Sequence, residues 1–449
     1  MAGLSEAEDY GVKQHRSIVH QYSKGERLSL QYKLQYGAPA CTMTPTSSNQ
    51  DRIAFVQRMG KALHRYGAPA HRLQDALTAM SNELGLHGNF FTTPSAIMYS
   101  YDIPGENGIA HLQRVHNNSI DLHRLSQLDK LFNDFLGTDL AVTAANARLD
   151  EILDESYGYH SIIKLLAFTL TSGGASTFFG GNLGDVALSS ICGFLLFLIF
   201  QWSQHRDAIR RLFDPLSAMV ISFAATAGAA LLGANADIST LAGIIVLVPG
   251  FSIIIGATEL VLDHPVSGSA RLARAGMSVM MLFIGVLFGS GLAQHFINIG
   301  SLPQGIPPAM PVWLPPLSIV IAGLGVGVLF NNSRRDLPWA VVAVCLPYFA
   351  MEFGLENLER APRLFLGAVI VALFGNMFAR AFDRPALTVL MPGILILVPG
   401  ATSFLSITDI AGGDVEAGLQ STFQVFISGA AIVSGFMTSS LLLPPRKAL

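Results

Sequence analysis

Charged residues are scarce in this sequence. Lysine, arginine, aspartate and glutamate make up 13% of the 449 residues, whereas hydrophobic residues make up 51%. The net charge of −3 and the lack of a basic cluster exclude the concentrated positive surface that nucleic-acid binding requires, so we expect no nucleic-acid partner. A composition this apolar is typical of a protein that crosses a lipid bilayer several times.

Cysteines and catalytic motifs are also lacking. Cys41, Cys192 and Cys345 are too few for a disulfide framework, and the last two lie in apolar runs, where we expect them to pack. The sequence has no His-Glu-x-x-His, no Gly-x-Ser-x-Gly and no Walker glycine loop. It therefore predicts no metal site, no cofactor, no catalytic residue and no ATP-driven step.

The charges are unevenly distributed along the chain. Residues 1–159 hold 31 of the 59 charged residues, so we place a boundary near Tyr159. Residues 1–50 are polar and predict a flexible leader, whereas residues 51–159 predict a separate domain, called the front domain from here on. No apolar stretch near the N-terminus resembles a signal peptide, so we expect the front domain in the cytosol.

The front domain mixes helical and strand patterns. Apolar residues recur at helical spacing from Asp51 to Gly67, and a second helix is expected from Pro69 to Gly85. Three β-prone runs follow at residues 89–93, 96–101 and 109–115, and then two helices at about 121–136 and 139–155. The sequence thus predicts a small α+β domain.

The remainder of the sequence contains an internal duplication. Gly243–Gly250 reads GIIVLVPG and Gly393–Gly400 reads GILILVPG, 150 residues later. We divide this part into a first membrane repeat, residues 160–300, and a second, residues 301–449, with five apolar segments in each. The segments are approximately 161–180, 185–203, 214–233, 239–261, 272–297, 313–331, 338–353, 362–381, 387–408 and 419–443. Five crossings per repeat predict an α-helical polytopic protein with ten transmembrane helices in two inverted repeats.

The basic residues agree with this topology. Arginine and lysine gather in the segments that would face the cytosol, namely Arg206–Arg211, Arg271–Arg274, Arg334–Arg335, Arg380–Arg384 and Arg446–Lys447. The exception is the outer loop Glu352–Arg363, where three glutamates offset Arg360 and Arg363. Because basic loops stay inside, we expect a multi-pass protein of the plasma membrane or a bacterial inner membrane, with both termini cytosolic.

A Pro-Gly pair interrupts the fourth segment of each repeat. Val248-Pro249-Gly250 and Val398-Pro399-Gly400 can each split a helix into two half-helices whose free ends bind a small-molecule substrate, although packing kinks are the simpler alternative. The polar residues just after the breaks would contact substrate or bond back to the helix; they are Ser252, Thr402 and Ser403.

Paired acids follow each break by nine residues. Glu259 and Asp409 are candidates for proton coupling or for binding a substrate ammonium group, with a solvated position at the headgroup boundary as the alternative. Asn182, Asp185, Asn331, Asn332 and Asp336 occupy the matched turns between the first two helices of each repeat, where they would cap helices or line the pathway. Asn376, inside an apolar segment, would bond to another helix or face a cavity.

Several motifs together resemble the threonine/serine exporter family. They are the hairpin Leu63–Leu73, the Phe-Phe-x-x-Pro segment Phe90–Pro94, the run Leu149–Tyr157, Phe179-Gly-Gly and the doubled Leu-Val-Pro-Gly. The resemblance covers about residues 52–440. It implies a cytosolic front domain joined to a ten-span carrier that exports small hydroxy amino acids by proton motive force. Two-subunit relatives associated with dicarboxylate export make a dicarboxylate the alternative substrate.

Two further classes of function stay open. The front domain could be a hydrolase or a ligand sensor that the membrane part anchors, or the membrane part could be a passive channel. The expected partners are a small-molecule substrate, protons and the lipid bilayer, and the sequence leaves a homo-oligomer open.

Overall fold

The structure is a computed structural model that describes residues 48–102, 108–115, 120–297, 305, 309–354, 357–397 and 415–444. Asn49–Leu449 forms one compact unit. Most of the predicted leader lies outside the described residues, as do five candidate site residues: Pro399, Gly400, Thr402, Ser403 and Asp409.

The front domain folds as a small α+β domain. Its elements are α2 (Asn49–Arg65), α3 (Ala70–Glu83), β1 (His87–Thr93), β2 (Ala96–Asp102), β3 (Ile109–Arg114), α4 (Leu122–Gly137) and α5 (Val142–Asp154). The strands pair antiparallel in the order β1-β2-β3. The predicted helices and strands are confirmed, except that α2 begins at Asn49, two residues before the predicted start at Asp51.

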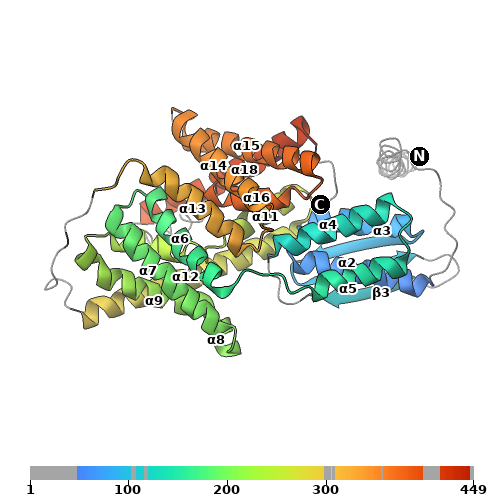
Figure 1. The fold of residues 1–449 in the computed structure, drawn as a ribbon, viewed down its shortest axis with the longest axis horizontal. Helices are drawn as coiled ribbons and strands as arrows, with labels where there is room; N and C mark the ends of the chain where they lie inside the picture. Colours follow the sequence, from blue (N-terminus) through green and yellow to red (C-terminus); the bar gives the residue numbers. More distant parts are fainter. Residues whose placement is uncertain are drawn as a thin grey trace, which may run out of the picture. The chain divides into compact units, whose positions relative to one another are not determined.

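Alternation along β2 explains how this domain is held together. Ile97, Tyr99 and Tyr101 are fully buried against the helices, whereas Met98 between them is exposed. Helices α2 and α3 contact the sheet, and α4 and α5 pack against α2 (Figure 1). Helices α2 and α3 end where Gly67 and Gly85 take positive φ angles that favour glycine. One face of the sheet therefore forms the core of the front domain.

The rest of the described chain is helical. Its first half contains α6 (Ser161–Phe178), α7 (Leu183–Ser203), α8 (Asp207–Arg211), α9 (Phe213–Leu232), α10 (Ala236–Ile244), α11 (Gly250–Val261) and α12 (Pro265–Phe296). The second half contains α13 (Leu314–Leu329), α14 (Leu337–Phe349), the π-helix η2 (Ala350–Gly354), α15 (Arg360–Phe382), α16 (Leu387–Leu397) and α18 (Val415–Leu442).

Five of these helices are long and apolar enough to cross a membrane: α7, α9, α12, α15 and α18. Shorter apolar helices include α11, α13 and the continuous pair α14 and η2. Two of the other predicted spans are interrupted locally, and in one of them α10 and α11 divide the apolar segment between them. In addition, Pro347 inside α14 cannot donate its backbone bond, and the chain continues as a π-helix.

The two halves use the same internal packing. Helix α9 packs against α7, α10 and α12, and α15 packs against α14, α16 and α18. Gly285 of α12 faces the Pro215 carbonyl and the Ala218 methyl group. Gly435 of α18 faces the carbonyl and methyl groups of the residues 150 positions further along, Phe365 and Ala368. The duplication read from the sequence thus extends to matched side-chain contacts.

The halves meet along two seams. Helix α6 packs against α13, and α11 packs against α16 and α18. At the first seam Gly174 of α6 faces the Ser318 backbone and the Ala322 methyl group of α13. Small residues let these two helices approach closely.

Candidate functional site

The predicted helix break of the first half lies between α10 and α11. Tight turns fill residues 245–249, where the amides of Leu247 and Val248 donate to carbonyls three residues earlier. Pro249 is the N-cap residue of α11 without a side-chain cap, and the Gly250 amide donates to the Val248 carbonyl at 2.8 Å. The break is therefore real in the structure, and the first turn of α11 presents backbone amides together with half-buried Ser252.

Three parts of the molecule meet at this break. Phe251, in the first turn of α11, packs both against the apolar core of the front domain and against a cluster in the second half. Its ring lies 6.5 Å from that of Phe330. Met391 of α16 is fully buried within the front-domain core.

Glu259, two turns further along α11, is completely buried. Its carboxylate accepts bonds from Arg271 Nε at 2.9 and 3.1 Å and from the Ser267 hydroxyl at 2.8 Å, both on α12. It also accepts a bond at 3.0 Å from the backbone amide of Ala70, the first residue of α3. Glu259 is therefore not a solvated headgroup-level acid but the centre of an ion pair that joins α11, α12 and the front domain.

His71 of α3 lies beside this ion pair. Its ring centroid is 6.3 Å from that of His264, in the turn between α11 and α12. Burial, followed by the positive charge of Arg72 and by His264 and Arg271, lowers the pKa of His71 to about 3. The ring is consequently neutral at physiological pH, because burial disfavours the charged imidazolium and the neighbouring positive charges oppose it further.

The turn between α13 and α14 forms the other contact with the front domain. The Phe330 and Asn331 carbonyls accept from the amides of Leu122 and His123, at 3.0 and 3.1 Å. Asn331 Nδ2 donates to Asp121 at 2.9 Å. The hydroxyl of Tyr159, at the end of the front domain, donates to the Asn332 carbonyl at 2.8 Å.

The same turn is fixed from the other side. Buried Asn332 donates to the Thr388 carbonyl at 3.1 Å, and buried Asp336 accepts from Ser333 and pairs with Arg384. These bonds tie the beginning of α14 to the turn between α15 and α16.

The remaining candidates hold helix ends. Asn182 and Asp185 form a capping box at the start of α7, and Asn182 Nδ2 donates to the Gly233 carbonyl at the end of α9. Asp185 also accepts from the amide of Asn235 at 2.7 Å and from Ser239 at 3.0 Å. Asn376 Nδ2 donates to the Leu443 carbonyl just after α18.

Sequence reasoning missed the partners of Glu259. The sequence analysis placed Arg271 only in an inner loop. Glu259 and Arg271 lie 12 residues apart, on either side of the short turn that joins α11 to α12, and this proximity could have suggested the ion pair. The Ala70 amide has no sequence signal, because it lies 189 residues away and is a backbone group.

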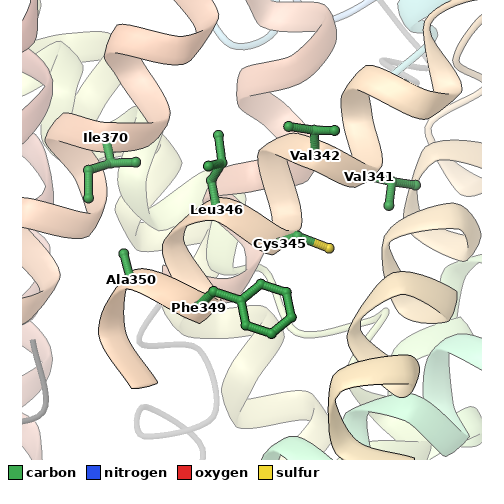
Figure 2. Close-up of a pocket in the computed structure, with 7 residues that line it drawn as sticks. All are labelled: Val341, Val342, Cys345, Leu346, Phe349, Ala350 and Ile370. Carbon is green, nitrogen blue, oxygen red and sulfur yellow. The ribbon is translucent and has the colours of Figure 1, made fainter. Parts of the chain in front are cut away.

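An apolar hollow of about 490 Å³ lies elsewhere, on α14, η2 and α15 (Figure 2). Its lining residues are Val341, Val342, Cys345, Leu346, Phe349, Ala350 and Ile370. It contains none of the candidate site residues and no charged partner for a zwitterion, so we do not assign the substrate to it. Among the described residues, no three acidic, histidine or cysteine side chains gather as a metal site.

The fold and its ion-paired junction define a multi-pass helical membrane protein with a front α+β domain. Two models of the threonine/serine exporters, ThrE and ThrE_2, match residues 54–293 and 317–442. The chain belongs to the threonine/serine exporter family.

The chain is also similar to pheromone-regulated membrane protein 10 of several yeasts. It is 24% identical to the Kluyveromyces lactis protein over 78% of this chain and 38% of that protein. It is 27% identical to the Debaryomyces hansenii protein over 80% and 37%, and 24% identical to the Saccharomyces cerevisiae protein over 78% and 46%. The chain thus spans less than half the length of these relatives. No solved structure matches.

Proposed function

We propose that this protein is a secondary exporter of small hydroxy amino acids, threonine and serine, driven by the proton gradient across the plasma membrane or a bacterial inner membrane. The observation that carries the proposal is the break between α10 and α11, placed where the front domain and both halves meet. Membership of the exporter family supports the class, and the broken helix supports the mode of binding.

Contacts at the helix ends support ten spans in two inverted repeats. Helix α6 begins just after Tyr159, which bonds to Asn332, and matched α13 ends at Phe330, beside the same contact. Helix α9 ends at the Asn182 turn, whereas its counterpart α15 ends near Arg384, which pairs with Asp336. Matched helices thus run in opposite directions relative to the front domain, which the basic loops place in the cytosol.

The substrate is held at the broken helices. The N-terminal amides of α11 carry a partial positive charge that suits an amino-acid carboxylate, and Ser252 lies in the same turn. From the repeated motif we extend this role to Pro399, Gly400, Thr402 and Ser403, which lie outside the described residues. Asn182, Asp185, Asn331, Asn332 and Asp336 hold the helix ends at the two mouths of the path, and Asn376 holds α18 against α15.

Glu259 is the proton-coupling residue of the first repeat, and Asp409 is its counterpart in the second. A proton on Glu259 removes the charge that pairs with Arg271, so that uptake of the proton changes the contacts of α11. This coupling uses an acid that is buried and that lies on the broken helix itself.

Counterflow in proteoliposomes tests this function. Vesicles loaded with threonine or serine should accumulate the labelled amino acid and should respond to an imposed pH gradient, whereas Glu259→Gln should lower the pH response at least tenfold. Asp237→Asn, which neutralises an exposed acid at the start of α10, is the matched control. Counterflow of succinate alone would favour the dicarboxylate alternative. Flux that ignores the pH gradient would contradict proton coupling and indicate a passive channel.

A further inference from the structure

The front domain contacts both halves of the membrane part. The first contact joins the Ala70 amide of α3 to Glu259, which is in the first half. The second contact joins Asp121, His123 and Tyr159 to the turn at Phe330–Asn332, which is in the second half. The front domain is thus attached to both halves of the membrane part.

The two contacts differ in what holds them. The second contact combines four hydrogen bonds with apolar packing, because Met391 is fully buried in the front-domain core and Leu387 packs against it. Burial of this kind does not depend on a charge. The first contact also includes apolar packing, from Phe251 of α11, but its hydrogen bond to the front domain depends on the single carboxylate of Glu259, which Ser267 and Arg271 hold in place.

We propose that the front domain is the cytosolic gate of the carrier, which stays attached to the second half and separates from the first half at Glu259 during each transport cycle. This inference rests on the proposed function, since it assumes that the two halves move against each other. Such a movement changes the distance between Glu259 and Asn331. A front domain that moves as one body cannot keep its contacts with both residues.

The charges around Glu259 explain why this contact is the one that opens. Arg271 of α12 pairs with Glu259, and the other charged and titratable groups at this contact are His264 of the preceding turn, which lies beside His71, and Arg72 and Asp75 of α3. While Glu259 is ionised, it neutralises Arg271 and binds the positive end of α3. Once Glu259 is neutral, Arg271 loses its charged partner and the Ala70 amide loses a charged acceptor, so the contact weakens.

Reversible cross-linking tests the gate. In a cysteine-free background, His71→Cys with His264→Cys bridges the first contact, and His123→Cys with Phe330→Cys, at the backbone bonds between α4 and the turn after α13, bridges the second. A short bifunctional thiosulfonate reagent joins each pair, and a reductant releases it. We expect the first cross-link to lower threonine export at least tenfold until reductant is added, and the second to leave export within twofold of the same protein before cross-linking.

Each other outcome contradicts the gate. Export that continues with the first contact cross-linked means that this contact never opens, and export blocked by both cross-links means that the front domain is not anchored to the second half. Export by the wild type and by the uncross-linked pairs is measured in parallel, and a wild type that exports no amino acid would contradict the proposed function instead.

Hydrogen exchange gives a second measurement that does not need active cysteine variants. In Glu259→Gln the amides at the start of α3 should exchange at least tenfold faster than in the wild type, because the charge that binds them is gone. Asp237→Asn, which removes an exposed acid outside the contact, should leave these amides unchanged. Equal exchange at Ala70–Leu73 in Glu259→Gln and the wild type would overturn the proposal.

Discussion

At the scale of single residues, the contact at Glu259 combines polar groups that are stable in a buried position only together. Glu259 is buried because Arg271, Ser267 and the Ala70 amide satisfy its carboxylate. Removing one member of a buried ion pair typically costs about 3–5 kcal/mol, because the other charge stays without a partner. His71 fits beside this pair only as a neutral ring, which is why its pKa lies far below the ordinary value of 6.5.

The pKa of His71 predicts an acid-sensitive protein. Between about pH 6.5 and pH 3 the unfolded chain binds a proton at His71 that the folded protein does not, so stability falls as the pH falls, by at most roughly 1.4 kcal/mol per pH unit. In detergent, the melting temperature of the wild type should drop between pH 7 and pH 5 more than that of His71→Gln. His87→Gln, at an exposed histidine, should behave as the wild type. An unchanged pH slope in His71→Gln would disprove this assignment.

At the scale of elements, glycines decide how closely the helices pack. A Cβ atom on Gly435 of α18 would meet the Phe365 carbonyl at 2.6 Å and the Ala368 methyl group at 2.8 Å. Gly429, two turns earlier on the same helix, has nothing within 4 Å of such an atom. A comparison of alanine substitutions at these two positions therefore distinguishes the effect of helix packing from the intrinsic helix propensity of alanine.

We expect Gly435→Ala to destabilise the protein by about 1–3 kcal/mol, because the backbone of α15 must move away. Gly429→Ala should be neutral or stabilise by up to about 1 kcal/mol, since alanine favours the helix. Thermal unfolding of the purified variants in detergent measures both changes. The interpretation fails if the two alanines have the same effect.

At the scale of the whole molecule, matched turns distinguish inverted from parallel repeats. The turn that begins α7 and the turn that begins α14 occupy equivalent positions, with exposed Leu183 in one and exposed Arg334 in the other. Inversion places the first outside and the second in the cytosol.

Membrane-impermeant thiol labelling of intact cells tests this arrangement in a cysteine-free background. We expect Leu183→Cys to be labelled from outside and Arg334→Cys only after the cells are opened. Labelling of both from the same side would show that the repeats run in parallel. Asp207→Cys serves as the reference for the inner side. This residue lies in the short helix α8, which its basic residues place in the cytosol.

Local patterns in the sequence predicted much of the fold. Helical and alternating periodicities gave the elements of the front domain, and the capping box of Asn182 and Asp185 follows from residue type and spacing alone. The repeated motif located the break at Pro249, because proline and glycine act on the backbone within a few residues. Among the described residues, the break between α10 and α11 and the kink in α14 were not distinguishable from continuous spans by hydropathy.

By itself the sequence determined the secondary-structure elements, the duplication and the helix break. Each of these depends on residues that are close along the chain or on a repeated sequence motif. Only the tertiary structure decided what Glu259 and Asn331 bind. Their partners Ala70 and Asp121 lie 189 and 210 residues away, and one of them acts through its backbone amide. Contacts of this kind arise when two separately patterned parts dock, and no local periodicity records which surfaces will meet.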